Sequence, residues 1–143
     1  MSDRLQRGHA ESHPAPTREA VFTERAPKAI GPYSQAIKAG GFVFTAGQAG
    51  IDPATGKLVE GGIEAQTRQT FRNLQAILEA AGTSLERAVR CGVFLQDIAD
   101  FKAMNAIYAE FLPPDRNPPA RTTVQAAKLP VGALVEIDVV ALL

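Results

Sequence analysis

Only two segments of this chain carry the apolar periodicity of an α-helix, and this shortage of helices limits the folds available to it. Residues 63–81 and 101–111 each repeat large apolar side chains at the spacing of a 3.6-residue turn. Gly82 is expected to end the first helix and Asp100 to cap the second. The two apolar stripes are Phe71, Leu74, Ile77, Leu78 and Ala81, and then Phe101, Met104, Ile107, Tyr108 and Phe111.

Most of the remaining folded chain has the pattern of β-strands. Residues 89–95 alternate apolar and polar side chains, which indicates a half-buried strand. Pro53 and Gly56 predict a turn over residues 52–56. Further strands are expected at residues 42–46, about 121–127 and about 133–142. The sequence therefore predicts an α+β domain in which two helices cover one face of a sheet of five or six strands.

The face without helices still carries apolar groups. Because side chains alternate between faces along a strand, each of the last two strands divides into two sets. In the last strand, one set mixes charged with apolar side chains. Its apolar members, on a face without helices, suggest burial against another subunit, so we predict a ring-like homo-oligomer. We expect Arg121 and Glu136 near its interfaces, with Arg121 on the face without helices. The sets are Arg121, Thr123 and Gln125 against Thr122, Val124 and Ala126, and Val135, Ile137 and Val139 against Glu136, Asp138, Val140 and Leu142.

The length and composition fit one domain preceded by a tail. The chain has 143 residues, and its composition becomes that of a folded domain from about Val21. We expect residues 1–20, with His9 and His13, to be a disordered or loosely attached tail, and residues 21–143 to be one domain. No apolar run is long enough to span a membrane, and no secretory signal or transit peptide is evident. The default location is cytoplasmic.

The residue inventory excludes several kinds of chemistry. Lys and Arg total 15 and Asp and Glu total 15, so nothing marks a general binder of nucleic acid or anionic membranes. The single cysteine, Cys91, excludes an intramolecular disulfide and a multi-cysteine metal site. Without the tail the domain has no histidine, which excludes a Ser-His-Asp triad and a histidine-based metal centre. Catalysis would depend on other polar side chains, backbone groups and water.

Four residues are candidates for such chemistry. Arg121 follows a proline-rich loop and could hold a carboxylate through two hydrogen bonds, or simply pair with a surface acid. Glu136 lies in the middle of a strand, where it could act as a general acid or base or pair with a neighbouring cation. Tyr33 lies in a turn and could equally be a core-edge residue. Gly47 follows a strand and allows a ligand to approach its backbone N–H.

Several short motifs follow one another in order between residues 26 and 141. They are IGPYSQA at 30–36, TAGQ at 45–48, TRQ at 67–69, VFLQD at 93–97, PAR at 119–121, KLP at 128–130 and VEI at 135–137. In combination, these motifs closely resemble the RidA/YjgF family of reactive-intermediate deaminases. The resemblance implies a chorismate-mutase-like fold, with a mixed sheet of about six strands backed by two helices. It also implies a homotrimer with active sites in the clefts between subunits.

The resemblance implies hydrolysis of reactive 2-imino acids, which form from enamines, to 2-keto acids and ammonia. Substrates would include 2-iminobutanoate and 2-iminopropanoate, and neither a metal nor an organic cofactor is implied. Many relatives have Ser in place of Ala46 and Cys in place of Thr123, which affects the expected substrate range more than the reaction type. The implied residues are Arg121 as carboxylate anchor, Glu136 beside the attacking water, and Tyr33, Gly47, Asn105 and Thr123 in the substrate pocket.

Two other functions remain open. The same cleft could bind a keto acid or an amino-acid metabolite without turnover, as a trimeric regulatory protein. A ribonuclease or translation inhibitor is a label that some family members bear, but the zero net charge and the absence of histidine from the domain weigh against it. A chorismate mutase is suggested by likeness of fold alone, which is poor support.

Overall fold

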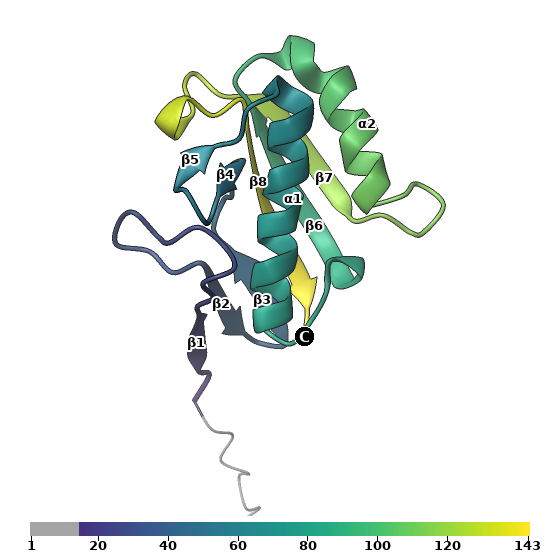
Figure 1. Ribbon diagram of the computed structural model, residues 1–143. Coiled ribbons are helices and arrows are strands. Elements are labelled where there is room, and N and C mark those ends of the chain that lie inside the picture. Colours follow the sequence, from purple (N-terminus) through teal and green to yellow (C-terminus); the bar gives the residue numbers. More distant parts are fainter. Residues whose placement is uncertain (1–14) are drawn as a thin grey trace, which may run out of the picture.

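Six strands pair into one sheet in the computed structural model, which describes residues 15–143 (Figure 1). These strands are β1 (Arg18–Val21), β2 (Ala36–Ala39), β3 (Phe42–Thr45), β6 (Ala88–Leu95), β7 (Ala120–Gln125) and β8 (Val135–Leu142). Their spatial order is β1-β2-β3-β8-β6-β7. Only β6 and β7 run parallel, and the other pairs are antiparallel. The expected mixed sheet of about six strands is confirmed, and β7 lies at its edge.

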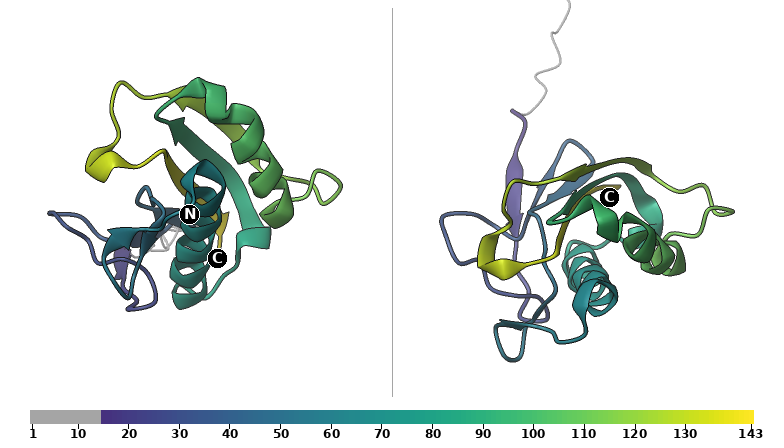
Figure 2. Two further views of the ribbon diagram at one scale, coloured as in Figure 1. Left: turned by 45° about the horizontal axis from the view of Figure 1, so that its top comes forward. Right: turned by 90° about the horizontal axis from the view of Figure 1, so that it is seen from above.

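Both long helices cover the same face of this sheet. They are α1 (Gly62–Ala80) and α2 (Phe101–Phe111), and the view from above shows them side by side beneath the curved sheet (Figure 2). Helix α2 forms the crossover between β6 and β7, as a parallel pair requires. The two helices and their common face were predicted from the sequence, and both predictions are confirmed.

The core lies between α1 and the central strands. Phe71 on α1, Val43 on β3 and Ile137 on β8 have no accessible surface. An aromatic stack joins the helices: the Phe71 ring centroid lies 4.8 Å from that of Phe111 and 5.4 Å from that of Tyr108. The predicted apolar stripes therefore form the core, as their spacing indicated, except that Phe101 at the start of α2 is exposed.

The structure refines the predicted boundaries. Strand β1 begins at Arg18, so the end of the segment expected to be a tail, residues 1–20, pairs with β2. His9 and His13 lie outside the described residues. The turn at residues 52–56 joins a small separate hairpin of β4 (Ile51–Asp52) and β5 (Lys57–Leu58). The Gly56 N–H donates to the Asp52 carbonyl at 2.8 Å, with Gly56 at a φ of 72°.

The two predicted helix ends have different outcomes. Gly82 follows α1 at a φ of 91°, a conformation that glycine adopts without strain. The side chain of Asp100, however, makes no capping hydrogen bond. A short 3₁₀ turn, η2 (Ile98–Asp100), precedes α2, and the Asp97 carboxylate accepts from the Ala99 N–H at 2.9 Å. Asp100 thus occupies the N-cap position of α2, as expected, but its side chain does not cap the helix, because a 3₁₀ turn capped by Asp97 leads directly into it.

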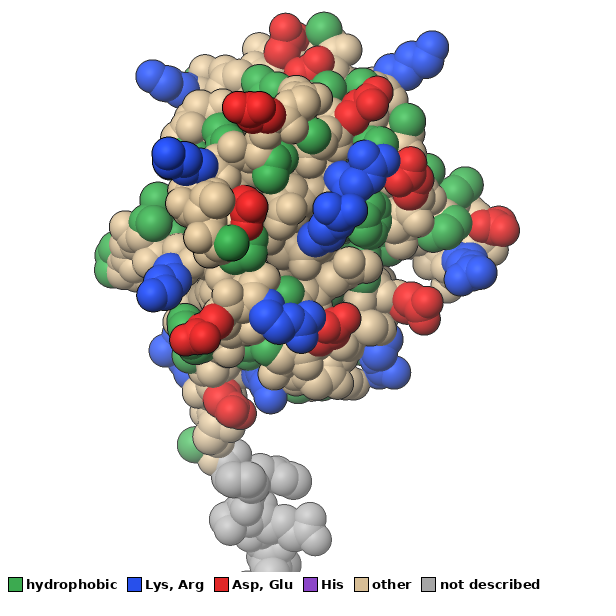
Figure 3. All heavy atoms as spheres, in the orientation of Figure 1, with side chains coloured by type: hydrophobic (Ala, Val, Ile, Leu, Met, Phe, Trp, Pro, Cys, Tyr) green, Lys and Arg blue, Asp and Glu red, His purple; other side chains and the backbone are tan. Residues whose placement is uncertain are grey.

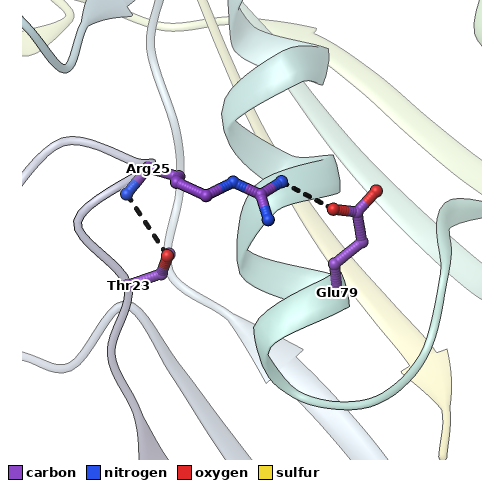
Figure 4. Close-up of polar contacts among 3 residues, drawn as sticks. All are labelled: Thr23, Arg25 and Glu79. Carbon is purple, nitrogen blue, oxygen red and sulfur yellow. Dashed lines mark hydrogen bonds and ion pairs between the residues drawn. The ribbon is translucent and has the colours of Figure 1, made fainter.

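The segment between β1 and β2 is tied to the domain mainly by Gln35. This side chain is 3% exposed, accepts from the Thr23 N–H at 2.7 Å and donates to the carbonyls of Thr23 and Pro27, each at 3.0 Å. Arg25 also pairs with Glu79 of α1 at 2.6 Å (Figure 4). Both side chains of that pair are largely exposed, so it contributes little stability. The buried amide is the stronger constraint.

The loop after β3 packs closely against α1 at Gly50. A Cβ atom at this position would lie 2.6 Å from the Gln66 Cα, which belongs to helix backbone and cannot move aside cheaply. We expect Gly50→Ala to lower the free energy of unfolding by about 1–3 kcal/mol in urea denaturation. Gly31→Ala is the matched control, because its Cβ would meet only ordinary contacts with Tyr33. Equal stability of the two variants would contradict this close packing.

Candidate functional site

A cavity of about 330 Å³ lies between the turn that carries Tyr33, the loop after β3 and the start of β8. Three predicted site residues line it: Tyr33, Gly47 and Glu136, which we call the cavity group. Apolar side chains supply much of the remaining wall, including Ile30 and Val131. Val131 has a φ of 54°, which is unfavourable for a β-branched residue. Such strain is often found where a binding surface requires it.

Gly47 makes room for the carboxylate of Glu136. A Cβ atom at position 47 would overlap the Glu136 side chain, so any other residue here would displace this carboxylate. The neighbouring residue fixes the loop, because Gln48 and Ile137 exchange two backbone hydrogen bonds of 2.8 and 2.9 Å. Within the described chain the Gly47 N–H donates no hydrogen bond. The cavity therefore places a carboxylate beside an available backbone donor.

The environment of Glu136 favours its protonated form. Partial burial raises the pKa of the carboxyl group, and the negative charge of Asp138 raises it further. Asp138 lies two residues along β8 on the same face, accepts from the Gly92 N–H at 3.1 Å and lies 3.8 Å from the Arg90 guanidinium. A raised pKa makes the ionised carboxylate a stronger proton acceptor than a solvated one.

Two buried polar residues of α1 hold the loops of the cavity in place. The Asn73 side chain is 1% exposed and donates to the carbonyls of Ala49 and Ile51 at 3.1 and 2.9 Å. The Gln66 side chain accepts from the Leu134 N–H at 2.9 Å, just before β8. Neither residue was predicted to support the site. Their signal in the sequence is a polar side chain among the buried positions of a helix, where it must find a partner.

Arg121 lies elsewhere, against α2. Its guanidinium donates to the Asn105 side-chain oxygen at 2.7 Å and lies 4.6 Å from the Tyr108 ring centroid. In the sheet Arg121 is paired with Cys91, which is fully buried beneath the helices. The expectation that Arg121 lies on the face without helices was therefore wrong. Helix α2 covers the edge strand β7, and the long side chain packs on its aromatic residues rather than pointing to the open face.

The predicted site residues thus form two groups on opposite faces of the sheet. Glu136 is paired with Phe94 on the open face, whereas Arg121 is paired with Cys91 on the covered face. Asn105 and Thr123 accompany Arg121, and we call these three the arginine group. The Thr123 hydroxyl oxygen is buried and has no hydrogen-bond partner among the described residues. A single chain does not bring the two groups into one cavity.

Other surfaces offer no competing cluster of the predicted residues. A hollow of about 410 Å³ lies under the proline-rich loop, beside Glu110 and Arg116, and contains none of them. Acidic and basic side chains are interspersed on the helix-bearing face (Figure 3). Within residues 15–143, no three His, Cys, Asp or Glu side chains gather to hold a metal ion. No helix in that part of the chain has the length and apolar character needed to cross a membrane.

Comparison with known proteins gives matches over most of the chain. The family model described as Endoribonuclease L-PSP matches residues 23–143. A RutC family protein of Pyrococcus horikoshii is 52% identical over 87% of this chain and 97% of its own. Reactive Intermediate Deaminase A of Arabidopsis thaliana, a chloroplastic protein, is 47% identical over 88% of this chain and 66% of its own. The crystal structure of a Rid-family protein from Yersinia pestis has a TM-score of 0.85 at 44% identity, covering 89% of this chain and all of the other.

The raised pKa of Glu136 predicts how its replacement changes stability with pH. A group whose pKa is higher in the folded than in the unfolded chain favours folding below the unfolded pKa, and this advantage is lost as the pH rises through the folded pKa. Above that pH the ionised Glu136 costs stability. We therefore expect Glu136→Gln to raise the melting temperature at about pH 8, with a smaller gain at about pH 4.

Thermal unfolding followed by circular dichroism measures this difference. Glu60→Gln, at an exposed position, is the control for loss of one negative charge. A Glu136→Gln variant that is less stable than the parent at pH 8, or whose gain is independent of pH, would contradict the assigned environment.

Proposed function

Because this chain belongs to the RidA/YjgF family, whose family model is described as Endoribonuclease L-PSP, we propose that it hydrolyses 2-imino acids in a site shared by two copies. One observation carries the proposal: the cavity group and the arginine group lie on opposite faces of the sheet. Since Arg121 and Glu136 cannot meet within one chain, a second copy must supply one of them. The relative named Reactive Intermediate Deaminase A supports the choice of reaction.

The open face of the sheet supports association of copies. Phe44 and Leu142 lie on this face with 45% and 40% of their surface exposed, beside the partly buried Phe42 and Val140. A shallow groove shared by Tyr33 and Ala46 leads from the region of the cavity towards Phe44. Burial of this apolar surface against like chains would stabilise an assembly. We propose a homotrimer with one site in each cleft between neighbours.

Arg121 suits the role of carboxylate anchor. Arg121 takes part in no ion pair among the described residues, and Asn105 accepts a hydrogen bond from only one of the guanidinium nitrogens. A planar guanidinium that is held on one side can present a second edge to a carboxylate through two parallel hydrogen bonds. The substrate carboxylate would then fix the imine carbon of the bound molecule relative to Glu136 of the neighbouring copy.

The reaction itself needs little from the protein. Water adds to the imine carbon, so that a C–O bond forms and the C=N double bond becomes a single bond. The resulting carbinolamine loses its nitrogen as ammonia when the C–N bond breaks, and the hydroxyl becomes the keto group. In its ionised form Glu136 takes a proton from the water that adds to the protonated imine, and it then gives that proton to the amine nitrogen. When the C–N bond breaks, the hydroxyl proton is lost to water, with no change in oxidation state. The Gly47 N–H is available to orient the substrate or the water.

The cavity favours small aliphatic substrates. Its volume of about 330 Å³ is modest, and Ile30 and Val131 present apolar side chains to it. We propose 2-iminopropanoate and 2-iminobutanoate as substrates, because their methyl and ethyl groups fit such a wall. Neither a metal nor an organic cofactor is required for this hydrolysis.

An endoribonuclease is the second candidate, since the matching family model carries that description. Cleavage of RNA would require a surface that binds phosphates, and such a surface normally has an excess of Lys and Arg. This chain has a formal net charge of zero, and its helix-bearing face mixes both signs (Figure 3). Charge therefore favours a small acid over RNA as the ligand.

The carboxylate anchor is tested by Arg121→Ala. We expect this variant to lose about 2–4 kcal/mol of transition-state stabilisation, a fall of roughly 10²- to 10³-fold in kcat/KM for imino-acid hydrolysis. Ammonia release is measured from imino acids generated in the assay by an amino-acid oxidase, against buffer alone. Arg116→Ala, at an exposed position of the proline-rich loop, is the control for loss of one positive charge and should retain full activity.

Two outcomes would contradict the proposal. Parent protein that does not accelerate ammonia release above buffer would exclude the reaction. Arg121→Ala protein that retains full activity would exclude the anchor.

A further inference from the structure

We infer that Phe101 and Tyr108 are positioning residues that hold the Arg121 guanidinium against α2, leaving some of its N–H donors free for the substrate carboxylate. This inference rests on the proposed function. We call the two rings the aromatic shelf. The Arg121 guanidinium carbon lies 4.6 Å from the Tyr108 ring centroid and 5.5 Å from that of Phe101. Both separations lie within the range in which a cation is attracted to a ring face.

The spacing of residues on α2 explains how three side chains meet one guanidinium. Phe101, Asn105 and Tyr108 follow one another at intervals of four and three residues, so they lie on one stripe of the helix. The rings contact the guanidinium, while the Asn105 oxygen accepts from one of its terminal nitrogens at 2.7 Å. A guanidinium held by two rings and one hydrogen bond has little freedom to rotate.

Tyr108 is the buried ring of the shelf, and Phe101 is the exposed one. Tyr108 is 7% exposed, and its ring meets that of Phe71 edge-on at an interplanar angle of 77°. Phe71 itself has no accessible surface, so the shelf rests on the core between the helices. Phe101 is 39% exposed and lies at the protein surface. The guanidinium is thus supported by the core yet remains near solvent.

The ring of Tyr108, rather than its hydroxyl group, supplies this support. The hydroxyl is buried beside the Cys91 thiol, and no hydrogen bond of normal geometry joins it to any described residue. Burial raises the pKa of Tyr108 far above neutrality, so the side chain carries no negative charge that could pair with Arg121. Removal of the hydroxyl therefore keeps the contact with Arg121 and relieves an unsatisfied polar group.

The experiment compares Phe101→Leu, Tyr108→Leu and Tyr108→Phe in steady-state imino-acid hydrolysis. Because the shelf positions a binding group, both leucine variants should raise KM roughly 3- to 30-fold while kcat changes less. Tyr108→Phe keeps the ring and should retain the parental KM. Phe111→Leu is the matched control, since it removes a ring from the same stack but is not in contact with Arg121, and it should also retain the parental KM.

Titration with 2-oxobutanoate, a 2-keto acid product, gives a readout that does not depend on turnover. Calorimetry should show the same weakening for Phe101→Leu and none for Tyr108→Phe. Phe101→Leu alone decides the test if Tyr108→Leu does not fold, because Phe101 lies at the protein surface.

Failure of the proposed function and failure of the shelf would give different results. Parent protein that binds the keto acid through the shelf but does not hydrolyse imines would exclude the proposed function and leave the shelf intact. Active protein in which both leucine variants keep the parental KM and affinity would overturn the shelf. A Phe111→Leu variant with an equal rise in KM would also overturn it, because the effect would then be general loosening of the core.

Discussion

The limited helical cover of the sheet is the constraint on which the rest of the structure depends. Helices α1 and α2 lie on one face, and α2 reaches the edge strand β7 as the crossover from β6 (Figure 2). This arrangement places Arg121 under α2 and leaves Glu136 on the other face, with Phe44 and Leu142 uncovered. One topological fact therefore accounts for both the divided site and the apolar surface that favours association.

Each group is then held by a different kind of interaction. Around Glu136 the decisive factor is space, because the absence of a side chain at Gly47 lets the carboxylate lie against the loop at some cost in solvation. Around Arg121 the decisive factor is contact between side chains, because the rings of α2 and the Asn105 amide restrict the guanidinium without neutralising its charge. In the proposed assembly, Glu136 would supply the acid and Arg121 the anchor, and the two would become complementary only on association of copies.

The sequence predicted the elements well and the placement of one side chain poorly. Periodicity identified both helices, and alternation placed Val135, Ile137 and Val139 in the core with Glu136 opposite. The same alternation failed for Arg121, because β7 is an edge strand of polar residues whose pattern does not say which face the helix covers. The roles of Gln66 and Asn73 depend on loop carbonyls distant in sequence, which no local pattern encodes.

Mixing of two inactive variants tests the shared site most directly. Arg121→Ala and Glu136→Gln are each expected to be inactive alone, but a neighbour pair that takes Arg121 from one variant and Glu136 from the other rebuilds an intact site. In equal mixtures that exchange subunits, verified by native mass spectrometry, activity should return to about a quarter of the parental value per chain. Mixed assemblies that form and remain inactive would contradict a site built between copies.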